Sequence, residues 1–226
     1  MTNGPKAIGI IMDGNRRWAK ARRLPTFEGH AKGIQKIVDV MNWAQVRGVV
    51  QVTIYAFSTE NWNRSPEEVS YLMELFGKFF AEHLSELSEK GVCVRFIGDR
   101  TLAPEDIQEI LKETEEKTAG GTKGTLVIAF SYGGRPEILA AVNELLEKGR
   151  QNVTKEEFEE ALWTAGLLDP DLIIRTGGDQ RLSNFLPWQS VYSELFFTET
   201  MWPDFSEPEL EKIFQEYATR ERRHGK

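Results

Sequence analysis

The sequence predicts an α/β fold in one layered domain that takes in residues 1–226. Short runs rich in isoleucine, valine and phenylalanine are typical of strands that are buried on both faces of a parallel sheet. Helical segments alternate with these runs, and the alternation implies right-handed crossovers between parallel strands. The strand candidates are residues 7–12, 49–57, 92–97, 125–130 and 172–175, with a weaker sixth at residues 195–198.

The helix candidates show apolar residues at the helical period. In residues 30–47, Ile34, Ile37, Met41 and Ala44 fall on one stripe, as a 3.6-residue repeat requires. Gly48 stands where a C′ glycine would end this helix. Further amphipathic segments follow at residues 104–118, 135–147, 155–164 and 207–222.

The longest helix candidate begins at Pro66. Ser65 and the glutamates after Pro66 form a capping box with proline at the first helical position. The apolar face that follows continues to Gly91, about 24 residues or 36 Å at 1.5 Å per residue. Periodicity alone favours a core-packing helix, because an apolar stripe is usually core; the alternative is the wall of an extended apolar cleft.

The composition is that of a globular protein, with 40% hydrophobic and 28% charged residues among 226. The single cysteine, Cys93, excludes an internal disulfide and fits a reducing compartment. A net charge of −7 argues against a nucleic-acid binder, which needs a basic surface. No apolar run is long enough to span a membrane, so we expect a cytoplasmic protein, with peripheral membrane association left open.

Positive charge is nevertheless concentrated locally. An acidic protein with clustered arginines fits a small anionic ligand better than a polymer. The sequence lacks the dinucleotide, P-loop and nucleophile-elbow motifs, and also the Asp-Asp-x-x-Asp pairs of aspartate-bound magnesium clusters. Five cations lie within eight residues, namely Arg16, Arg17, Lys20, Arg22 and Arg23.

The first of three polar segments, residues 13–18, directly follows a predicted strand, where ligands bind in open α/β sheets. Gly14 permits a tight turn whose amides could cradle a phosphate. Arg16 and Arg17 can bind phosphate in a bidentate way, and Asp13 offers the oxygen ligand that Mg²⁺ takes. An ordinary Asp-Gly turn with solvated arginines explains this segment alone equally well.

Two more polar segments follow later strands. Residues 58–64 contain hydroxyls, a carboxylate, an amide, an indole and a guanidinium, few of which a core would accept. In residues 175–185, Arg175 and Arg181 flank a Gly-Gly turn, with Ser183 two residues beyond, which suits a diphosphate. Three such segments at strand ends favour an anion site over surface turns.

Longer stretches of the chain carry a resemblance to a known family. They are MDGNRRWA, Gly29-His30, YAFSTENWNRS, YGGR and RTGGDQRLSNFLPWQSVYSELFFTETMWPDF. These stretches resemble the cis-prenyltransferase family, and within it the bacterial undecaprenyl diphosphate synthases. The resemblance implies a central, mostly parallel six-stranded sheet flanked by helices, a homodimer and Mg²⁺ dependence. It also implies successive cis additions of isopentenyl diphosphate to an allylic diphosphate, usually farnesyl diphosphate, giving a Z-polyprenyl diphosphate such as the cell-wall lipid carrier precursor undecaprenyl diphosphate.

The resemblance also assigns roles to individual residues. Asp13 would engage Mg²⁺ and the allylic diphosphate, Glu194 would share the Mg²⁺, and Asn61 is the second catalytic candidate. The proton acceptor stays open, because a neutral amide is a poor base; Asn61 could instead orient the substrate while a diphosphate oxygen takes the proton. The remaining substrate-binding candidates are Gly14, Asn15, Arg16, Arg17, Trp18, His30, Ser58, Thr59, Glu60, Trp62, Arg64, Arg175, Arg181, Leu182 and Ser183.

The long helix acquires a function under this resemblance. A growing prenyl chain needs a long apolar tunnel, and the predicted lining is Leu72, Leu75 and Phe76, with Ala56 on the adjacent strand. The helix has no obvious insertion after Phe80, which favours a medium-length product over a very long one. The resemblance also extends to residues 223–225, an Arg-x-Gly element expected to reach the partner subunit's site.

Four residues depart from the family pattern. Arg16 stands where many bacterial members have glycine, Thr26 where many have arginine, Asp179 where glutamate is common and Pro187 where leucine is common. Two other functions stay open: a short-chain or irregular-coupling synthase, and a non-catalytic accessory subunit. Such a subunit would be expected to lack Asp13 or the arginine pair.

Overall fold

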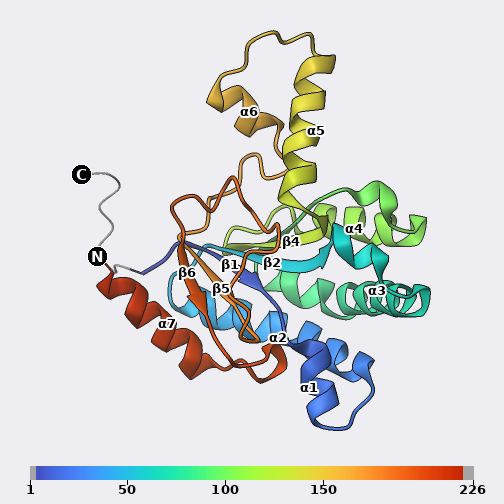
Figure 1. The fold of residues 1–226 in the computed structure, drawn as a ribbon, viewed down its shortest axis with the longest axis vertical. Coiled ribbons are helices and arrows are strands. Elements are labelled where there is room, and N and C mark those ends of the chain that lie inside the picture. Colours follow the sequence, from blue (N-terminus) through green and yellow to red (C-terminus); the bar gives the residue numbers. More distant parts are fainter. Residues whose placement is uncertain (1–3, 221–226) are drawn as a thin grey trace.

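The computed structural model describes residues 4–220, which contain one six-stranded sheet (Figure 1). Neighbouring strands of this sheet are all parallel, in the order β3-β4-β2-β1-β5-β6. The predicted α/β fold class, a parallel sheet flanked by helices, is therefore confirmed. The strands are β1 (Ala7–Ile11), β2 (Gln51–Ser58), β3 (Val92–Ile97), β4 (Gly124–Tyr132), β5 (Leu172–Arg175) and β6 (Glu194–Phe197).

The helices surround this sheet, and none within the described residues is both long and apolar enough to cross a membrane. The α-helices are α1 (Asn15–Ala21), α2 (Thr26–Val46), α3 (Pro66–Glu89), α4 (Glu105–Thr118), α5 (Gly134–Glu147), α6 (Lys155–Ala161) and α7 (Glu207–Thr219). Three short 3₁₀ helices also occur, η1 (Thr59–Asn63), η2 (Arg100–Leu102) and η3 (Trp202–Asp204).

The two faces of the sheet are covered differently. Successive side chains of a strand point to opposite faces, so Ile8 and Ile10 pack into a large core with α2, α3, α4 and α7, whereas Ile11 packs on the other face. That second face is closed by Phe185 and Leu186, from the segment after β5. Helices α5 and α6 form a small cluster of their own and project from one end of the molecule (Figure 1).

The order of β2, β1 and β5 brings three loops together at the carboxyl ends of these strands. β1 pairs with β2 on one side and with β5 on the other. Because all three strands run parallel, the segments that begin at Asp13, Ser58 and Arg175 leave the sheet side by side.

The structure differs from the predicted helices most clearly at α1, α2 and α6, and several strand ends differ by one or two residues. α1 was not predicted, because Ala19 is its only buried residue and no apolar stripe reveals it. α2 begins at Thr26 rather than at residue 30, since Thr26, Phe27 and Glu28 are exposed and do not extend the buried apolar stripe. α6 ends at Ala161 rather than at residue 164, because Leu162 adopts an extended conformation and is buried. Residues 221–222 of the last predicted helix lie outside the described residues.

Two glycines allow α1 and α2 to pack closely. A Cβ atom at Gly29 would lie 2.0 Å from the Asn15 carbonyl oxygen, and one at Gly33 would lie 2.2 Å from Asn15 Oδ1. A side chain at either position would therefore separate the two helices. This close packing holds the start of α1, directly after Asp13, against α2.

Candidate active site

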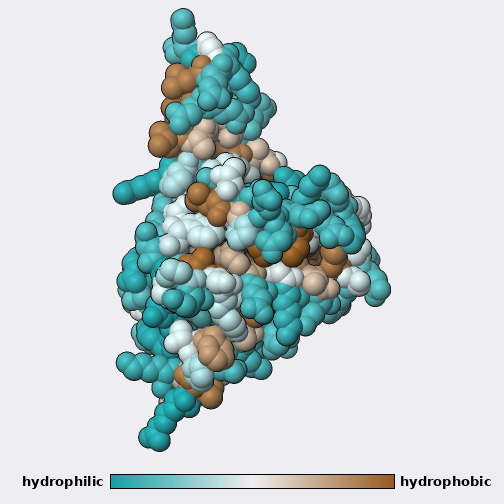
Figure 2. Space-filling view, turned by 90° about the vertical axis from the view of Figure 1, so that its right-hand side faces the viewer, coloured by the Kyte–Doolittle hydropathy of each residue, from teal (hydrophilic) through white to brown (hydrophobic). Residues whose placement is uncertain are grey.

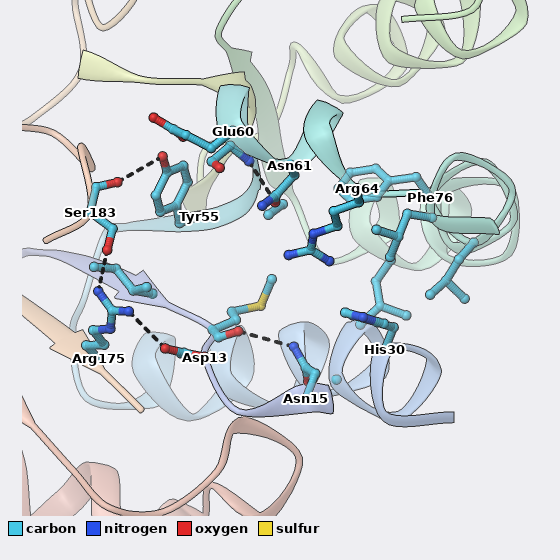
Figure 3. Close-up of a pocket in the computed structure, with 18 of the residues that line it drawn as sticks. Asp13, Asn15, His30, Tyr55, Glu60, Asn61, Arg64, Phe76, Arg175 and Ser183 are labelled. Atoms are coloured by element: carbon cyan, nitrogen blue, oxygen red, sulfur yellow. Dashed lines mark hydrogen bonds and ion pairs between the residues drawn. The ribbon is translucent and has the colours of Figure 1, made fainter. Parts of the chain in front are cut away.

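A cavity of about 580 Å³ lies at the carboxyl ends of β1, β2 and β5 (Figure 3). Loops after these strands form its polar side, and α2 and α3 form its apolar side. Segments far apart in the sequence thus meet around one space. The predicted site residues that line it are Asp13, Asn15, His30, Ser58, Glu60, Asn61, Arg64, Arg175 and Ser183.

An ion pair between Asp13 and Arg175 joins the first loop to the third (Figure 3). Arg175 Nη2 donates to Asp13 Oδ2 at 2.9 Å, and the Arg175 side chain is only 5% exposed. The Thr176 hydroxyl also donates to the Asp13 carbonyl at 2.8 Å. A guanidinium this buried needs an anion beside it, so each charge fixes the position of the other.

The second arm of Arg175 organises the loop after β5. Its Nη1 donates to the Arg181 carbonyl oxygen at 2.5 Å and to Ser183 Oγ at 2.8 Å. Ser183 and Asn184 have φ values of 49° and 67°, a left-handed conformation that is uncommon for residues other than glycine. Such conformations persist where the surroundings fix them, and Arg175 supplies part of that constraint.

The Asp13 carboxyl is held ionised. Burial raises its pKa, but the hydrogen bond and charge of Arg175, the Gly14 amide and the charge of Arg17 together outweigh burial, so the pKa lies below its usual value. The Gly14 N–H donates to Asp13 Oδ1 at 2.6 Å. An ionised, partly exposed carboxylate therefore faces the cavity.

Two further arginines lie at the outer edge of the Asp13–Arg175 pair. Arg17 Nη2 is 3.3 Å from Asp13 Oδ1, and Arg181 Nη2 donates to Asp179 Oδ2 at 2.7 Å. Their side chains are 49% and 60% exposed. Gly177, at φ 84°, makes room for them, because a Cβ there would lie 2.7 Å from Arg17 Nη2. Exposed N–H donors thus stay available beside the cavity.

The second loop is ordered by its own side chains. Asn61 Oδ1 accepts from the Ser58 N–H at 3.1 Å, which closes a capping box over η1. The Trp62 indole donates to Ser131 Oγ at 2.9 Å and packs edge-to-face on Phe57. Trp62 therefore attaches this otherwise polar loop to the sheet.

His30 lies in a cluster of charges on the α2–α3 side of the cavity (Figure 3). Its Nε2 is 3.6 Å from Glu68 Oε1, which also accepts from Arg64 Nη1 at 2.9 Å. Burial lowers the pKa of His30 to about 4, assisted by the charges of Arg64 and Arg16 and opposed by Glu68. His30 is therefore neutral at neutral pH.

Other predicted residues lie around the cavity rather than along it. The Trp18 indole donates to Asp204 Oδ1 at 2.7 Å, away from the Asp13 carboxylate. Arg16 is 61% exposed and 3.9 Å from Glu68 Oε2. Leu182 packs on the second core face. Gly14 is the N-cap of α1 at φ 103°, and Thr59 opens η1.

Glu194 lies at the amino ends of the parallel strands, whereas Asp13 follows the carboxyl end of β1. It begins β6 and is in register with Leu172 and, through it, with Ile8, which is five residues before Asp13. Five residues correspond to about 16 Å along a strand. Glu194 Oε2 accepts from Arg220 Nη1 at 2.6 Å instead. Within one chain, the structure does not bring the two proposed Mg²⁺ ligands together. The Arg-x-Gly element at residues 223–225 lies outside the described residues.

Sequence reasoning missed two residues with polar side chains that line the cavity, Tyr55 and Asn184. Burial and the charge of Glu60 raise the pKa of Tyr55, and its hydroxyl donates to the Ser183 carbonyl at 3.3 Å. Asn184 Oδ1 accepts from the Arg135 N–H at 2.9 Å, which links the third loop to α5. Both residues belong to stretches that resemble the family, and that was the signal available.

Pro187, which stands where leucine is common in the family, packs against the start of α5. A Cβ at Gly134 would lie 1.9 Å from Pro187 Cδ. The Gly134 N–H donates to the Asn184 carbonyl oxygen at 2.8 Å. The proline ring therefore occupies the space that glycine leaves, and it helps to hold the loop after β5 against α5.

The apolar side of the cavity is formed by the long helix and β2. Leu72, Leu75 and Phe76 of α3 line it, together with Ala56 and with Ile34 of α2. Leu72 and Phe76 also belong to the main core cluster, together with Met73, Phe79 and Phe80 of the same helix. The helix therefore serves both purposes that the sequence left open, as core and as cavity wall.

Comparison with known proteins identifies the family. The family model "Putative undecaprenyl diphosphate synthase" matches residues 11–225. The chain belongs to this family. This undecaprenyl diphosphate synthase family member is thus a prenyltransferase, as the sequence predicted.

The chain is similar to relatives over nearly its whole length. It is 45% identical over 223 residues to the isoprenyl transferase of Fusobacterium nucleatum, covering 99% of this chain and 96% of that protein. It is also 45% identical to the "Ditrans,polycis-undecaprenyl-diphosphate synthase ((2E,6E)-farnesyl-diphosphate specific)" of Micrococcus luteus, covering 98% and 91%.

Two solved structures share the fold. Lavandulyl diphosphate synthase from Lavandula x intermedia, in complex with dimethylallyl diphosphate, superposes with a TM-score of 0.95 at 33% identity over 99% of both chains. A "probable undecaprenyl diphosphate synthase" from Campylobacter jejuni gives 0.83 at 32% identity, over 98% of this chain and 99% of that one.

The depressed pKa of His30 predicts a pH dependence of stability. Unfolded histidine titrates near 6.5 and folded His30 near 4, so the unfolded state binds more protons between these values and stability falls as pH drops through that window. We expect His30 to lower the free energy of unfolding by about 2 kcal/mol from pH 7 to pH 5. Urea unfolding at both pH values measures this change. In His30→Gln the free energy of unfolding should fall by about 2 kcal/mol less than in the wild type over the same pH range. An equal loss in both proteins would contradict the burial of a neutral imidazole.

Proposed function

We propose that this prenyltransferase adds isopentenyl diphosphate units sequentially, in cis, to an allylic diphosphate in a Mg²⁺-dependent reaction. Farnesyl diphosphate is the proposed primer, and the proposed product is a Z-polyprenyl diphosphate such as undecaprenyl diphosphate, for the lipid carrier of cell-wall synthesis. The name of the Micrococcus luteus relative, which specifies farnesyl diphosphate, supports this choice.

One observation carries the proposal: a single cavity combines a charged end with an apolar end. Asp13 and Arg175 lie at the charged end, and Leu72, Leu75 and Phe76 line the apolar end. An allylic diphosphate has the same two parts, a dianionic or trianionic head and a hydrocarbon tail. We propose that the tail lies along α3, in a tunnel that starts from this cavity.

Asp13 is suited to hold Mg²⁺. Magnesium in phosphate-handling sites takes one or two carboxylates and completes its shell with phosphate oxygens and water. The described residues contain no group of three or more His, Cys, Asp or Glu that could hold a metal. We therefore propose Asp13 with the diphosphate itself as the ligands. A share for Glu194 would require a second subunit. Bound Mg²⁺ would stabilise negative charge on the departing diphosphate.

The arginines would serve the two diphosphates. As the allylic carbon–oxygen bond breaks, the isopentenyl double bond forms the new carbon–carbon bond and a proton then leaves its C2. Arg17, beside Asp13, would place a cationic donor at the leaving diphosphate, where charge increases in the transition state, while Arg175 and Arg181 would hold the isopentenyl diphosphate next to it. Asn61 uses its amide oxygen to cap η1, which supports a positioning role, with a diphosphate oxygen as proton acceptor.

A second candidate function is supported by the structural comparison. The superposition on lavandulyl diphosphate synthase, with a TM-score of 0.95, keeps a short-chain or irregular-coupling reaction as the alternative. Chromatography of the products separates the two functions, because sequential elongation gives a ladder of polyprenols and irregular coupling gives one branched short product. An accessory subunit has less support, since Asp13, Arg175 and Ser183 are present and joined by hydrogen bonds.

We also propose a homodimer. Leu139, Val142 and Leu146 of α5 are 60%, 39% and 63% exposed and recur at helical spacing on one face. Figure 2 shows apolar residues on the projecting end of the molecule, where α5 and α6 lie. Sedimentation velocity should give a dimer for the wild type and a monomer for Leu139→Asp; a monomeric wild type would contradict the proposal.

Replacing Asp13 tests the proposed activity. Asp13→Asn keeps the shape of the side chain but removes the charge, so we expect turnover of farnesyl and isopentenyl diphosphates to fall on the order of 10³-fold. A radiolabelled condensation assay measures the rate, and Asp39→Asn, an exposed carboxylate on α2, is the matched control. Turnover retained in Asp13→Asn would refute the proposed reaction.

Changing the apolar wall tests the proposed path of the growing chain. We expect Ala56→Leu to shorten the products, because the larger side chain fills space beside α3, and Leu75→Ala to lengthen them. Thin-layer chromatography of the dephosphorylated products measures chain length, and melting temperatures check that both variants are folded. An unchanged product ladder in both variants would place the growing chain elsewhere.

A further inference from the structure

A row of nine exposed residues, 20–28, includes the last two residues of α1, the turn between α1 and α2 and the start of α2. We call it the α1–α2 tip. It carries three cations, Lys20, Arg22 and Arg23, against one acid, Glu28, although the whole chain has a net charge of −7. Its apolar residues are also exposed, with Leu24 at 42% and Phe27 at 46%.

The backbone of the tip ends α1 in a common motif with an uncommon residue at its left-handed position. The Leu24 N–H donates to the Ala19 carbonyl at 2.9 Å and the Arg23 N–H to the Lys20 carbonyl at 3.1 Å, which is the hydrogen-bond pattern of a Schellman motif. Arg23 occupies the C′ position with φ 57°, where glycine is usual. Leu24, which in this motif normally packs back on its helix, stays exposed.

Two cations of the tip have no acidic partner among residues 4–220. Arg22 is paired with Asp204 at 2.8 Å and lies over the Trp18 ring at 4.4 Å. Lys20 and Arg23 form no salt bridge with any residue that the structure describes. In sequence, the nearest acid to Arg23 is Glu28 and the nearest to Lys20 is Asp13. The exposed end of the tip therefore combines unpaired positive charge with apolar side chains.

The tip lies beside the wall of the cavity. The rings of Phe27 and Tyr71 are 5.4 Å apart, and the Tyr71 hydroxyl donates to the Phe27 carbonyl at 3.4 Å. Tyr71 directly precedes Leu72 on α3, which lines the cavity. In Figure 2, hydrophilic side chains project around apolar ones at the end of the molecule where α1 lies.

We propose that the α1–α2 tip binds the surface of an anionic phospholipid bilayer. Lys20 and Arg23 would contact headgroup phosphates, while Leu24 and Phe27 would enter the interfacial region. The purpose of this contact rests on the proposed function, because a polyprenyl product must pass from the cavity into a bilayer. The contact itself does not depend on turnover.

A bilayer fits the tip better than another polyanion does. A nucleic acid would engage the cations but leave Leu24 and Phe27 in water. A single apolar pair flanked by cations matches an interface in which phosphates lie above hydrocarbon. The attraction is local, since the charge of the rest of the chain opposes approach to an anionic surface.

Co-sedimentation with lipid vesicles tests the proposal on the full chain. We expect binding to vesicles of phosphatidylcholine with 30% phosphatidylglycerol, weaker binding to phosphatidylcholine alone, and weaker binding at high salt. Arg23→Gly should weaken binding about fivefold, the loss for one cation near the surface. It should also raise the melting temperature, because glycine adopts the φ of this position without strain, so misfolding cannot cause the loss.

Matched variants complete the test. Phe27→Ser should reduce vesicle binding, whereas Leu102→Ser, an exposed leucine on η2, and Lys112→Gln, an exposed lysine on α4, should not. The proposal would be overturned if the wild-type protein did not bind anionic vesicles. It would also be overturned if Arg23→Gly and Phe27→Ser bound them as tightly as the wild type. A loss of affinity for single-stranded DNA in Arg23→Gly with vesicle binding unchanged would overturn it as well.

The membrane contact and the reaction can fail separately. Turnover is measured in detergent with soluble diphosphates, where Arg23→Gly should match the wild type. Turnover without vesicle binding would overturn the membrane contact alone. Vesicle binding without turnover would overturn the proposed reaction alone.

Discussion

A buried guanidinium at the carboxyl edge of a parallel sheet organises this protein's site. Arg175 ends β5 with its side chain 5% exposed, so it needs an anion, and Asp13 after β1 provides it. Its Nη1 donates to the Arg181 carbonyl and to Ser183, which constrains a loop with left-handed backbone. One side chain thereby joins segments that are 162 residues apart in the sequence.

This pair also separates structural charge from charge that is available to a ligand. The Asp13–Arg175 pair is close to neutral and holds the geometry, while Arg17 and Arg181 remain half exposed at its edge. On the other side of the cavity, Glu68 offsets Arg64 beside a neutral His30. The net charge of −7 therefore describes the surface as a whole and not the space in which a diphosphate would lie.

The long helix α3 is the second determinant of the site. Phe76 packs on Phe130 of β4 at 5.1 Å between ring centroids and lines the cavity as well. Core packing thus fixes the wall against which a hydrocarbon chain would lie. At the start of the same helix, Tyr71 contacts Phe27 and connects this wall to the exposed turn between α1 and α2. Helix α3 therefore contacts both the cavity and the turn between α1 and α2.

The sequence by itself determined the parallel α/β fold, the family and the three polar loops, because strand runs, helical periods and long motifs are local signals. It missed α1, whose polar surface gives no period, and it missed Tyr55 and Asn184, whose positions depend on contacts between distant loops. It also grouped Glu194 with Asp13, whereas strand register places Glu194 at the amino ends of the strands, away from Asp13 at their carboxyl ends. Only the tertiary structure decided which polar side chains meet, because strand order and register, and not spacing along the chain, set the distances between them.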